Sequence, residues 1–393
     1  MASKVEAPPA SGRPASGNEA TTSVEAAVPP RWRDDARHVL VPWLVARVVV
    51  VGSLAVSRYL FTNIGHGRRP VALGQGLFAW DAAFYRSIAE HGYRSFDGSL
   101  RFFPLVPVVT RIVGWVTGDA VALVLVANAS AFVLAVLLAR LVRRDLHDEV
   151  AVDRAVWLVA IAPSAAVLVL GYAEATFMAL AVATFLGLRS RRWWVAALCG
   201  YLAGLTRPLG ALLTIGAAVE AGRGWRGAST RERIERSIAV VAPAAGTGTF
   251  LAWVGARYGD WLEPLHLQQR GIARGGFLDP ARALWHSAQE LLGRHHVGTG
   301  LHFVWALGFL ALLVVVARRL PASYTAFAGT GLLLVLSSHN LDSLERYALS
   351  LFPLVVAGAV LIRSESVARP VLLLSVAGLV GYSVLAFFGV YVP

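Results

Sequence analysis

Long apolar runs recur along this chain, and they limit what it can fold into. The first covers residues 40–60, and others lie near 119–142, 152–170, 173–188, 193–219, 237–256, 301–317, 322–338, 345–362 and 370–391. As helices, runs of about 17–25 apolar residues cross roughly 30 Å of hydrocarbon. Since 56% of all residues are hydrophobic and 15% are charged, we expect an all-α polytopic membrane protein with about 9–11 transmembrane helices.

The positive charge of the chain is concentrated between these runs. The net charge is +12, and every basic residue except Lys4 is an arginine. Arginines in short loops favour the cytoplasmic side, which places the N-terminus and the loops near 140–154, 189–192 and 318–319 there. The arginine-rich loop 220–236 fits the same side only if the run 193–219 does not cross as one straight helix. Pro208 favours a break at that point, because proline disrupts helix geometry at Arg207.

Composition divides the chain into a tail and a membrane domain. Residues 1–37 lack apolar periodicity, so we expect a disordered cytoplasmic tail before a transmembrane domain at 38–393. Within that domain, 61–118 and 257–300 are expected to be long external loops. The short run 102–117 favours an interfacial or re-entrant helix. Arg47 interrupts the first span, and it either faces the protein interior or reaches the membrane surface.

One stretch of the first loop is dense in charged and aromatic residues. It reads W-D-A-A-F-Y-R-S-I-A-E-H-G-Y from residue 80 and, after a polar spacer, R-F-F-P-L-V-P. If residues 82–92 are helical, Asp81 lies at the helix start, Tyr85 shares its face and His91 is nearby. Asp81 is then either an ordinary helix cap or a base that accepts a proton from a sugar hydroxyl.

Other candidates for chemistry are polar residues inside or beside apolar runs. Glu174 follows Tyr172 and Ala173, where a lone carboxylate is costly unless it is paired or hydrated. Arg207 either binds a lipid phosphate, reaches the membrane surface or pairs with Glu174. His339 and Arg346 flank a turn between two spans and are expected on the same side as Asp81, although a solvated loop explains them equally well.

Several functional classes lack support in the sequence. No phosphate-binding loop, Asp-x-Asp pair or zinc-binding helix motif occurs, and the histidines of 257–300 show no spacing suited to a metal. The arginines form no stripe interleaved with exposed aromatic residues, so no nucleic-acid partner is expected. We therefore expect neither a metal nor another cofactor.

The motifs together resemble a known family. W-D-x-x-x-Y-x-x-I-A-x-x-G-Y, F-F-P-L-x-P, P-S followed by Y-x-E, then L-T-R-P and E-R-Y stand in the order seen in the PIG-V-like mannosyltransferases of actinobacteria. These enzymes are GT-C glycosyltransferases. The resemblance covers residues 40–360, and it departs from the family at Ala173 and in the loop 257–300.

This resemblance implies an enzyme that moves mannose from a polyprenyl-phosphate donor to a hydroxyl of a lipid, glycan or protein acceptor. Transfer would invert the anomeric carbon, with Asp81 as catalytic base and an arginine such as Arg207 or Arg346 stabilising the leaving phosphate. The expected substrate-binding residues are Trp80, Tyr85, His91, Glu174, Arg207, His339, Arg346 and Tyr347. The expected location is the plasma membrane, with an extracytoplasmic active site.

Two other classes remain open from the sequence. A transporter or flippase of lipid or sugar predicts interrupted helices in both halves of the chain, and the sequence indicates one interruption. A non-catalytic assembly subunit of the same fold predicts that Asp81 is dispensable.

Overall fold

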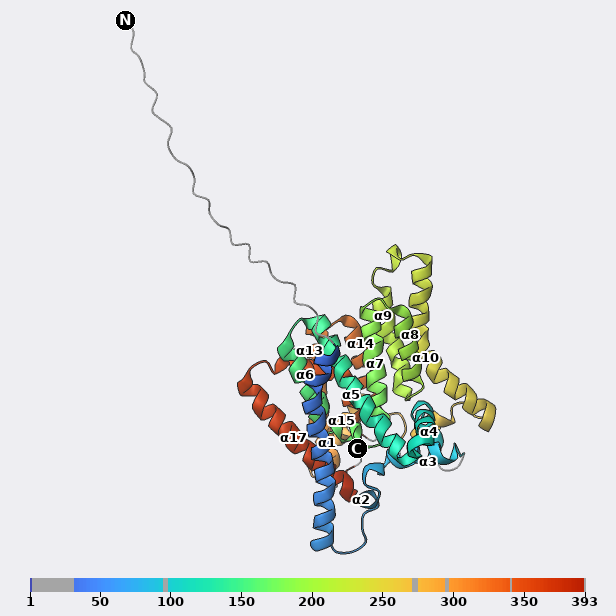
Figure 1. Cartoon of the computed structure of the whole chain (residues 1–393), viewed down its shortest axis with the longest axis vertical. Coiled ribbons are helices and arrows are strands. Elements are labelled where there is room, and N and C mark those ends of the chain that lie inside the picture. Colours follow the sequence, from blue (N-terminus) through green and yellow to red (C-terminus); the bar gives the residue numbers. More distant parts are fainter. Residues whose placement is uncertain (2–31, 95–97, 271–274, 294–296, 340, 392–393) are drawn as a thin grey trace. The chain divides into compact units, whose positions relative to one another are not determined.

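The computed structural model describes residues 1, 32–94, 98–270, 275–293, 297–339 and 341–391 (Figure 1). Within these ranges the chain is helical and contains no strand; an isolated β-bridge joins Phe277 to Ser338. The predicted all-α fold is therefore confirmed.

The helices follow the apolar runs, interrupted at several points. In chain order the α-helices are α1 (Trp32–Asn63), α2 (Val71–Gln75), α3 (Asp81–His91), α4 (Leu105–Thr117), α5 (Asp119–Leu146), α6 (Glu149–Ile161), α7 (Glu174–Arg189), α8 (Trp193–Gly204), α9 (Leu213–Gly222), α10 (Thr230–Tyr258), α11 (Glu263–Gln268), α12 (Pro280–Leu291), α13 (Val297–Arg319), α14 (Ala322–Leu336), α15 (Leu344–Ser350), α16 (Phe352–Leu361) and α17 (Glu365–Phe388). Short 3₁₀-helices are η1 (Gly76–Phe78), η2 (Ser99–Arg101), η3 (Ala165–Leu168), η4 (Pro208–Leu212) and η5 (Trp225–Gly227).

Several helices are long and apolar enough to cross a membrane, as expected for a multi-pass membrane protein. Among the described residues these are five, α1, α5, α10, most of α13, and α17, and α15 with α16 makes a sixth if that pair, bent by 85°, is one span. This is fewer than the 9–11 spans expected, because the other apolar runs form shorter helices or are broken. The run 152–170, for example, leaves helical geometry after Ile161, just before Pro163.

Helix α1 begins earlier than the predicted tail boundary. Its first turns bury Asp35, which forms ion pairs with Arg140 and Arg143, each at 2.7 Å. Residues 32–37 are therefore helical and belong to the domain, because they neutralise arginines of α5. The remainder of the predicted tail, residues 2–31, lies outside the described residues.

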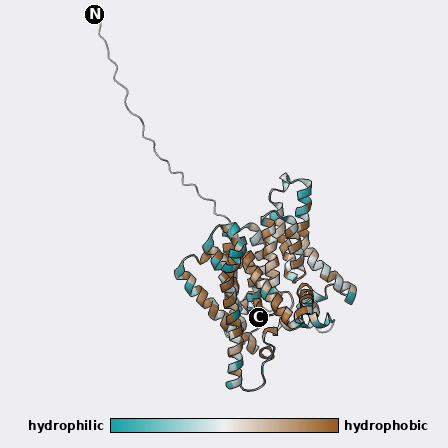
Figure 2. Cartoon of the chain, viewed as in Figure 1, coloured by the Kyte–Doolittle hydropathy of each residue, from teal (hydrophilic) through white to brown (hydrophobic). Residues whose placement is uncertain are grey.

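The arginine-bearing turns meet at one end of the helices. Arg189, at the end of α7, pairs with Asp145 of α5 at 3.1 Å and with Glu220 of α9 at 3.6 Å. Asp148, before α6, pairs with Arg363, which follows α16. Figure 2 shows hydrophobic residues along most of the helices and hydrophilic ones gathered at helix ends. From this arginine end, the 16 residues of α7 lead back to Glu174, about 24 Å along the helix.

The run 193–219 folds back on itself, as the sequence predicted. Helix α8 ends at Gly204, Arg207 is extended (φ −160°, ψ 153°), and η4 and α9 return the chain to the arginine end. Helix α8 packs closely on α10: a Cβ at Gly204 would lie 2.1 Å from the carbonyl oxygen of Pro243. The small residues thus let the two backbones touch and set the position of the break.

Arg47 faces the protein interior, which decides between the two alternatives left open by the sequence. Its Nε donates to Asn128 Oδ1 at 2.8 Å and its Nη2 to the carbonyl of Leu168 at 3.0 Å. Its guanidinium also lies 4.4 Å from the centre of the Trp43 ring. These contacts join α1, α5 and the end of η3.

Candidate active site

Asp81 is the first residue of α3, yet its side chain does not cap that helix. Trp80 occupies the cap position without a side-chain hydrogen bond. The Asp81 carboxylate instead accepts a hydrogen bond from Arg346 Nη2 at 2.7 Å, and the Asp81 backbone N–H donates to the Tyr172 hydroxyl at 3.3 Å. An ordinary helix cap is thereby ruled out, since the carboxylate faces a residue 265 positions along the chain.

The residue before Asp81 has an unusual backbone. Trp80 has φ 60° and ψ −127°, a region that bulky side chains rarely adopt. Its indole Nε1 donates to the carbonyl of Ala386 on α17 at 3.1 Å. Such a conformation costs about 1–3 kcal/mol and persists only where the surroundings enforce it. The Trp80 backbone conformation sets the direction in which α3 starts, and this direction places Asp81 next to Arg346.

Two arginines and two carboxylates form a buried chain of charge. Arg346 Nε lies 2.6 Å from Glu174 Oε1, and Arg207 Nη1 lies 2.8 Å from the same oxygen. Arg207 also donates to Ser350 Oγ at 3.3 Å. Glu174, Arg207 and Arg346 are all buried, so each charge depends on its opposite for compensation. Helices α3, α7 and α15 and the break before η4 contribute one charged side chain each.

Aromatic rings surround these charges. The guanidinium carbons of Arg207 and Arg346 lie 4.9 and 5.2 Å from the centre of the Tyr347 ring. Tyr172 lies 5.2 Å from Arg346. Tyr85 is buried, and burial, with the negative charge of Glu174 as a further cause, raises its pKa well above the usual range. Tyr85 therefore remains a neutral hydroxyl at ordinary pH.

A cavity of about 310 Å³ opens beside this network. Asp81, Arg207 and Arg346 line it, together with Arg101 from η2. Neutral polar side chains, Gln268, Gln269, Ser337 and Ser338, and apolar ones such as Phe277 complete the walls. The site can therefore present a carboxylate and several guanidinium groups to a substrate with hydroxyl and anionic groups.

The family comparison matches a part of the chain that contributes charged residues to this cavity. Residues 71–220 match the model described as Mannosyltransferase (PIG-V). That segment contains Asp81, Arg101, Glu174 and Arg207. We refer to residues 71–220 as the PIG-V segment.

A solved structure resembles the chain more distantly. It is the oligosaccharyltransferase of Archaeoglobus fulgidus, crystallised with Zn and sulfate, with a TM-score of 0.33 and 13% sequence identity over 87% of this chain. The chain spans about half, 52%, of the length of that protein. No curated protein sequence matches the chain significantly.

Most of the predicted site residues meet at the cavity. Within the PIG-V segment Asp81, Tyr85 and Arg207 line it, and Arg346 and Tyr347 join from α15. Glu174 lies behind the two arginines, in contact with both. The alternative that Arg207 pairs with Glu174 is thus correct, and Arg207 faces the cavity as well. Trp80 lies next to Asp81, but its indole bonds to α17.

His91 and His339 are not among the residues that line the cavity. His91 is ten residues beyond Asp81, about 15 Å along α3, where it is exposed and lies 3.9 Å from Glu90. His339 is exposed, and its backbone N–H donates to the carbonyl of Gly276 at 3.1 Å. The His339 side chain lies beside Gly275, which lines the cavity, so its donor-binding role stays a prediction.

The sequence prediction omitted several residues that the structure places in the site. Tyr172 opens the Y-x-E motif of the PIG-V segment, and Arg101 opens R-F-F-P, so both stand in or next to motifs that carried the family resemblance. Gln268 and Gln269, which also line the cavity, belong to the segment 257–300, which was predicted to be a loop. Two adjacent amide side chains in a largely apolar chain are the sequence feature that could have marked them.

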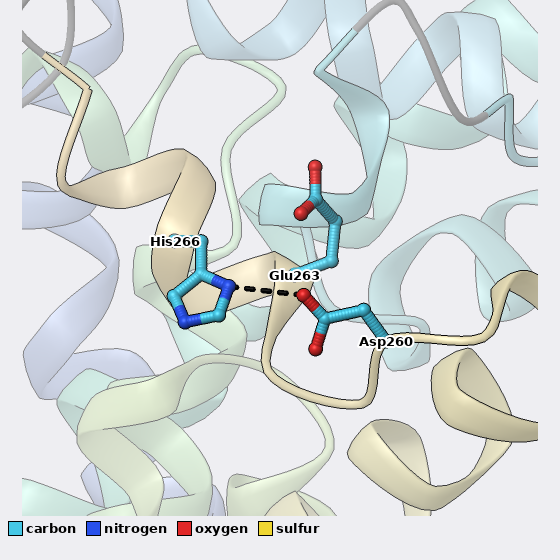
Figure 3. Close-up of side chains that lie close together, drawn as sticks. All are labelled: Asp260, Glu263 and His266. Carbon is cyan, nitrogen blue, oxygen red and sulfur yellow. Dashed lines mark hydrogen bonds and ion pairs between the residues drawn. The ribbon is translucent and has the colours of Figure 1, made fainter.

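One group of side chains near the cavity could hold a metal ion. Asp260, Glu263 and His266 have ligand atoms that all lie within 4.8 Å of one another (Figure 3). The described residues contain no other such group. His266 Nδ1 lies 3.0 Å from Asp260, and Glu263 pairs with Arg270 at 3.2 Å. Histidine spacing gives no sign of this group, because its other two members are carboxylates three and six residues before His266.

Proposed function

We propose that this chain is an inverting glycosyltransferase that moves mannose from a polyprenyl-phosphate donor to a hydroxyl of a lipid, glycan or protein acceptor. The observation that carries the proposal is the meeting of Asp81 with arginines in one cavity, where Asp81, Arg101 and Arg207 come from the PIG-V segment. A carboxylate suits proton removal from a hydroxyl, and guanidinium groups suit a leaving phosphate.

The chemistry follows from the positions of these groups. The acceptor oxygen attacks the anomeric carbon while Asp81 takes its proton, and the bond from that carbon to the phosphate oxygen breaks on the opposite face. A single displacement of this kind inverts the anomeric carbon. Arg346 occupies Oδ2 of Asp81, whereas Oδ1 makes no hydrogen bond with a described residue. Oδ1 is therefore the oxygen that would receive the proton.

The membrane setting supports a lipid-borne donor. The cavity lies at the end of α7 opposite the arginine end, and arginine-rich turns favour the cytoplasmic side. We therefore place the active site on the extracytoplasmic face of the plasma membrane and the N-terminus in the cytoplasm. Polyprenyl-phosphate sugars, lipid or glycan acceptors and membrane lipids are the proposed partners. The arginines supply the positive charge in this mechanism, so it uses no metal or cofactor.

Replacing Asp81 tests the proposal. Purified full-length Asp81→Asn, assayed with a polyprenyl-phosphate mannose donor, should lose transfer activity by about 10²–10⁴-fold, the typical contribution of a general base. Asp119→Asn is the matched control: Asp119 also begins a helix and pairs with an arginine, Arg111 at 2.8 Å, but lies outside the cavity. Normal transfer by Asp81→Asn would refute the assignment.

A transporter of lipid-linked sugars is the second candidate, because two of the broken apolar runs meet in the structure. The breaks at Arg207 and between α15 and α16 meet where Arg207 donates to Ser350. Paired broken helices are a feature of transporters. Reconstituted vesicles distinguish the two: counterflow of the donor lipid without any glycosylated product would favour transport.

A further inference from the structure

The arginines of the cavity differ in how their charge is compensated. Glu174 and Asp81 face Arg207 and Arg346, so these four side chains form a set with no net charge. Arg101 lines the same cavity but forms no ion pair with any described residue. Its side-chain hydrogen bond goes from Nε to the carbonyl of Gly98 at 3.3 Å. Among the described residues that line the cavity, Arg101 therefore carries the uncompensated charge.

Aromatic rings hold the Arg101 guanidinium in place. Its central carbon lies 5.4 Å from the centre of the Phe84 ring and 5.3 Å from that of Phe102. These rings stack on each other at 4.8 Å, and Phe102 packs edge-on against Tyr85 at 5.1 Å. Ring contacts orient a guanidinium without cancelling its charge or using its N–H groups.

We propose that Arg101 binds the phosphate of the lipid-linked donor and of the polyprenyl-phosphate product, an inference that rests on the proposed function. Arg207 and Arg346, which the sequence analysis assigned to this role, mainly orient each other and Asp81 through Glu174. One net positive charge matches the single negative charge of a sugar phosphodiester. Release of the sugar leaves a phosphomonoester, which carries about −1.5 to −2 at pH 7. Arg101 therefore binds the product more tightly than the donor.

The test compares binding of charged and uncharged lipids. Wild type, Arg101→Gln and Arg101→Lys, each full-length in nanodiscs, are titrated with farnesyl phosphate and with farnesol. Loss of charge-assisted hydrogen bonds should weaken farnesyl phosphate binding by roughly 10- to 100-fold in Arg101→Gln. Farnesol binding should not change, and lysine should restore part of the affinity for the phosphate.

Arg86→Gln is the matched control. Arg86 also lies over a phenylalanine, Phe78, at 5.3 Å, but it pairs with Glu90 at 2.7 Å and is not part of the cavity wall. This variant should bind farnesyl phosphate like the wild type.

Three results would overturn the proposal: unchanged farnesyl phosphate binding in Arg101→Gln, an equal loss of farnesol binding, or a lysine variant as weak as the glutamine variant. The second would make Arg101 a packing residue, and the third would deny its charge a role. Failure here is distinguishable from failure of the proposed function, because Asp81→Asn reports on transfer and these titrations report on binding alone.

Discussion

A single carboxylate oxygen contacts two buried arginines. Glu174 Oε1 lies 2.8 Å from Arg207 and 2.6 Å from Arg346, which arrive from the break after α8 and from α15. Arg346 in turn holds Asp81. Glu174 thus determines the geometry of the proposed base without touching the part of the cavity where substrate would lie.

Glu174→Gln should destabilise the protein strongly. Removing one partner from a buried ion pair typically costs about 3–5 kcal/mol, because it leaves uncompensated charge in the interior. Glu90→Gln breaks a partly exposed pair with Arg86 on one helix face, a change worth about 0.3–0.5 kcal/mol. Thermal unfolding in detergent compares the two variants. Equal melting temperatures would show that Glu174 does not hold the network together.

The site residues that could be predicted from the sequence are charged residues that stand among apolar ones. Asp81, Glu174, Arg207 and Arg346 stood out because charge is costly among apolar runs. Arg101 did not stand out, because its distinguishing property is the absence of an ion pair, and that depends on residues distant in the chain. For the same reason, sequence alone could not separate His91, an exposed residue, from the site residues on its helix.

Between elements, the contact of α8 with α10 positions the break that carries Arg207. A Cβ at Gly246 of α10 would lie 2.0 Å from the carbonyl oxygen of Tyr201 on α8. Thr247 adds a hydrogen bond to the carbonyl of Gly204 at 3.1 Å. The backbones approach so closely that any side chain at Gly246 must move α8.

Gly246→Ala should therefore lower both the melting temperature and the transfer activity, since α8 would displace Thr206 and Arg207 with it. Gly248→Ala, two residues along the same helix, is the control: no atom lies within 4 Å of the added methyl group. Alanine is the better helix former by about 1 kcal/mol, so Gly248→Ala should be neutral or stabilising. Activity and melting temperature of Gly246→Ala equal to those of Gly248→Ala would contradict this account.

A proline stands next to each of two helix breaks, and one of these breaks was predicted. Pro208 led to the correct prediction of a break in 193–219. The bend between α15 and α16 was not predicted, although Pro353 stands in the first turn of α16 and disfavours helical geometry just before it. The break at Arg207 lines the cavity, and α15, ahead of the second break, adds Arg346 and Tyr347. Broken helices are tolerated in a membrane where protein surrounds them.

At the scale of the whole molecule, ion pairs join the helix ends that meet at the arginine end. Asp148 joins the turn between α5 and α6 to Arg363, which follows α16. The hydrogen bond from Arg363, followed by one from the Ala151 backbone, lowers the pKa of Asp148 below its ordinary value. A carboxyl whose pKa is lowered by folding stabilises the folded state while it is ionised, and this contribution disappears as pH falls through the lowered pKa.

Asp148→Asn should therefore reduce stability at neutral pH and flatten its decline from about pH 4 downward, where aspartate becomes protonated. Asparagine keeps the helix-capping oxygen that Val150 and Ala151 use, so the variant removes mainly the charge. Melting temperatures of both proteins between pH 3 and pH 7 measure the difference. Parallel profiles would show that Asp148 contributes nothing to acid sensitivity.

At this scale the arginine distribution was the most informative part of the sequence. It predicted that the loops near 140–154, 189–192 and 220–236 share one end, and the contacts among Asp145, Arg189 and Glu220 bear this out. The number of spans was less predictable, because hydropathy does not separate a continuous helix from two shorter ones.

The returning pair α8 and α9 also determines how deep the cavity lies. The 16 residues of α7 place Glu174, which contacts Arg207, about 24 Å from the arginine end, and the 12 residues of α8 rise about 18 Å, against roughly 30 Å of hydrocarbon. With that end at one membrane surface, the Arg207 break lies below the opposite surface. A lipid could then present its headgroup from within its own leaflet, while a water-soluble acceptor would have to descend to meet it.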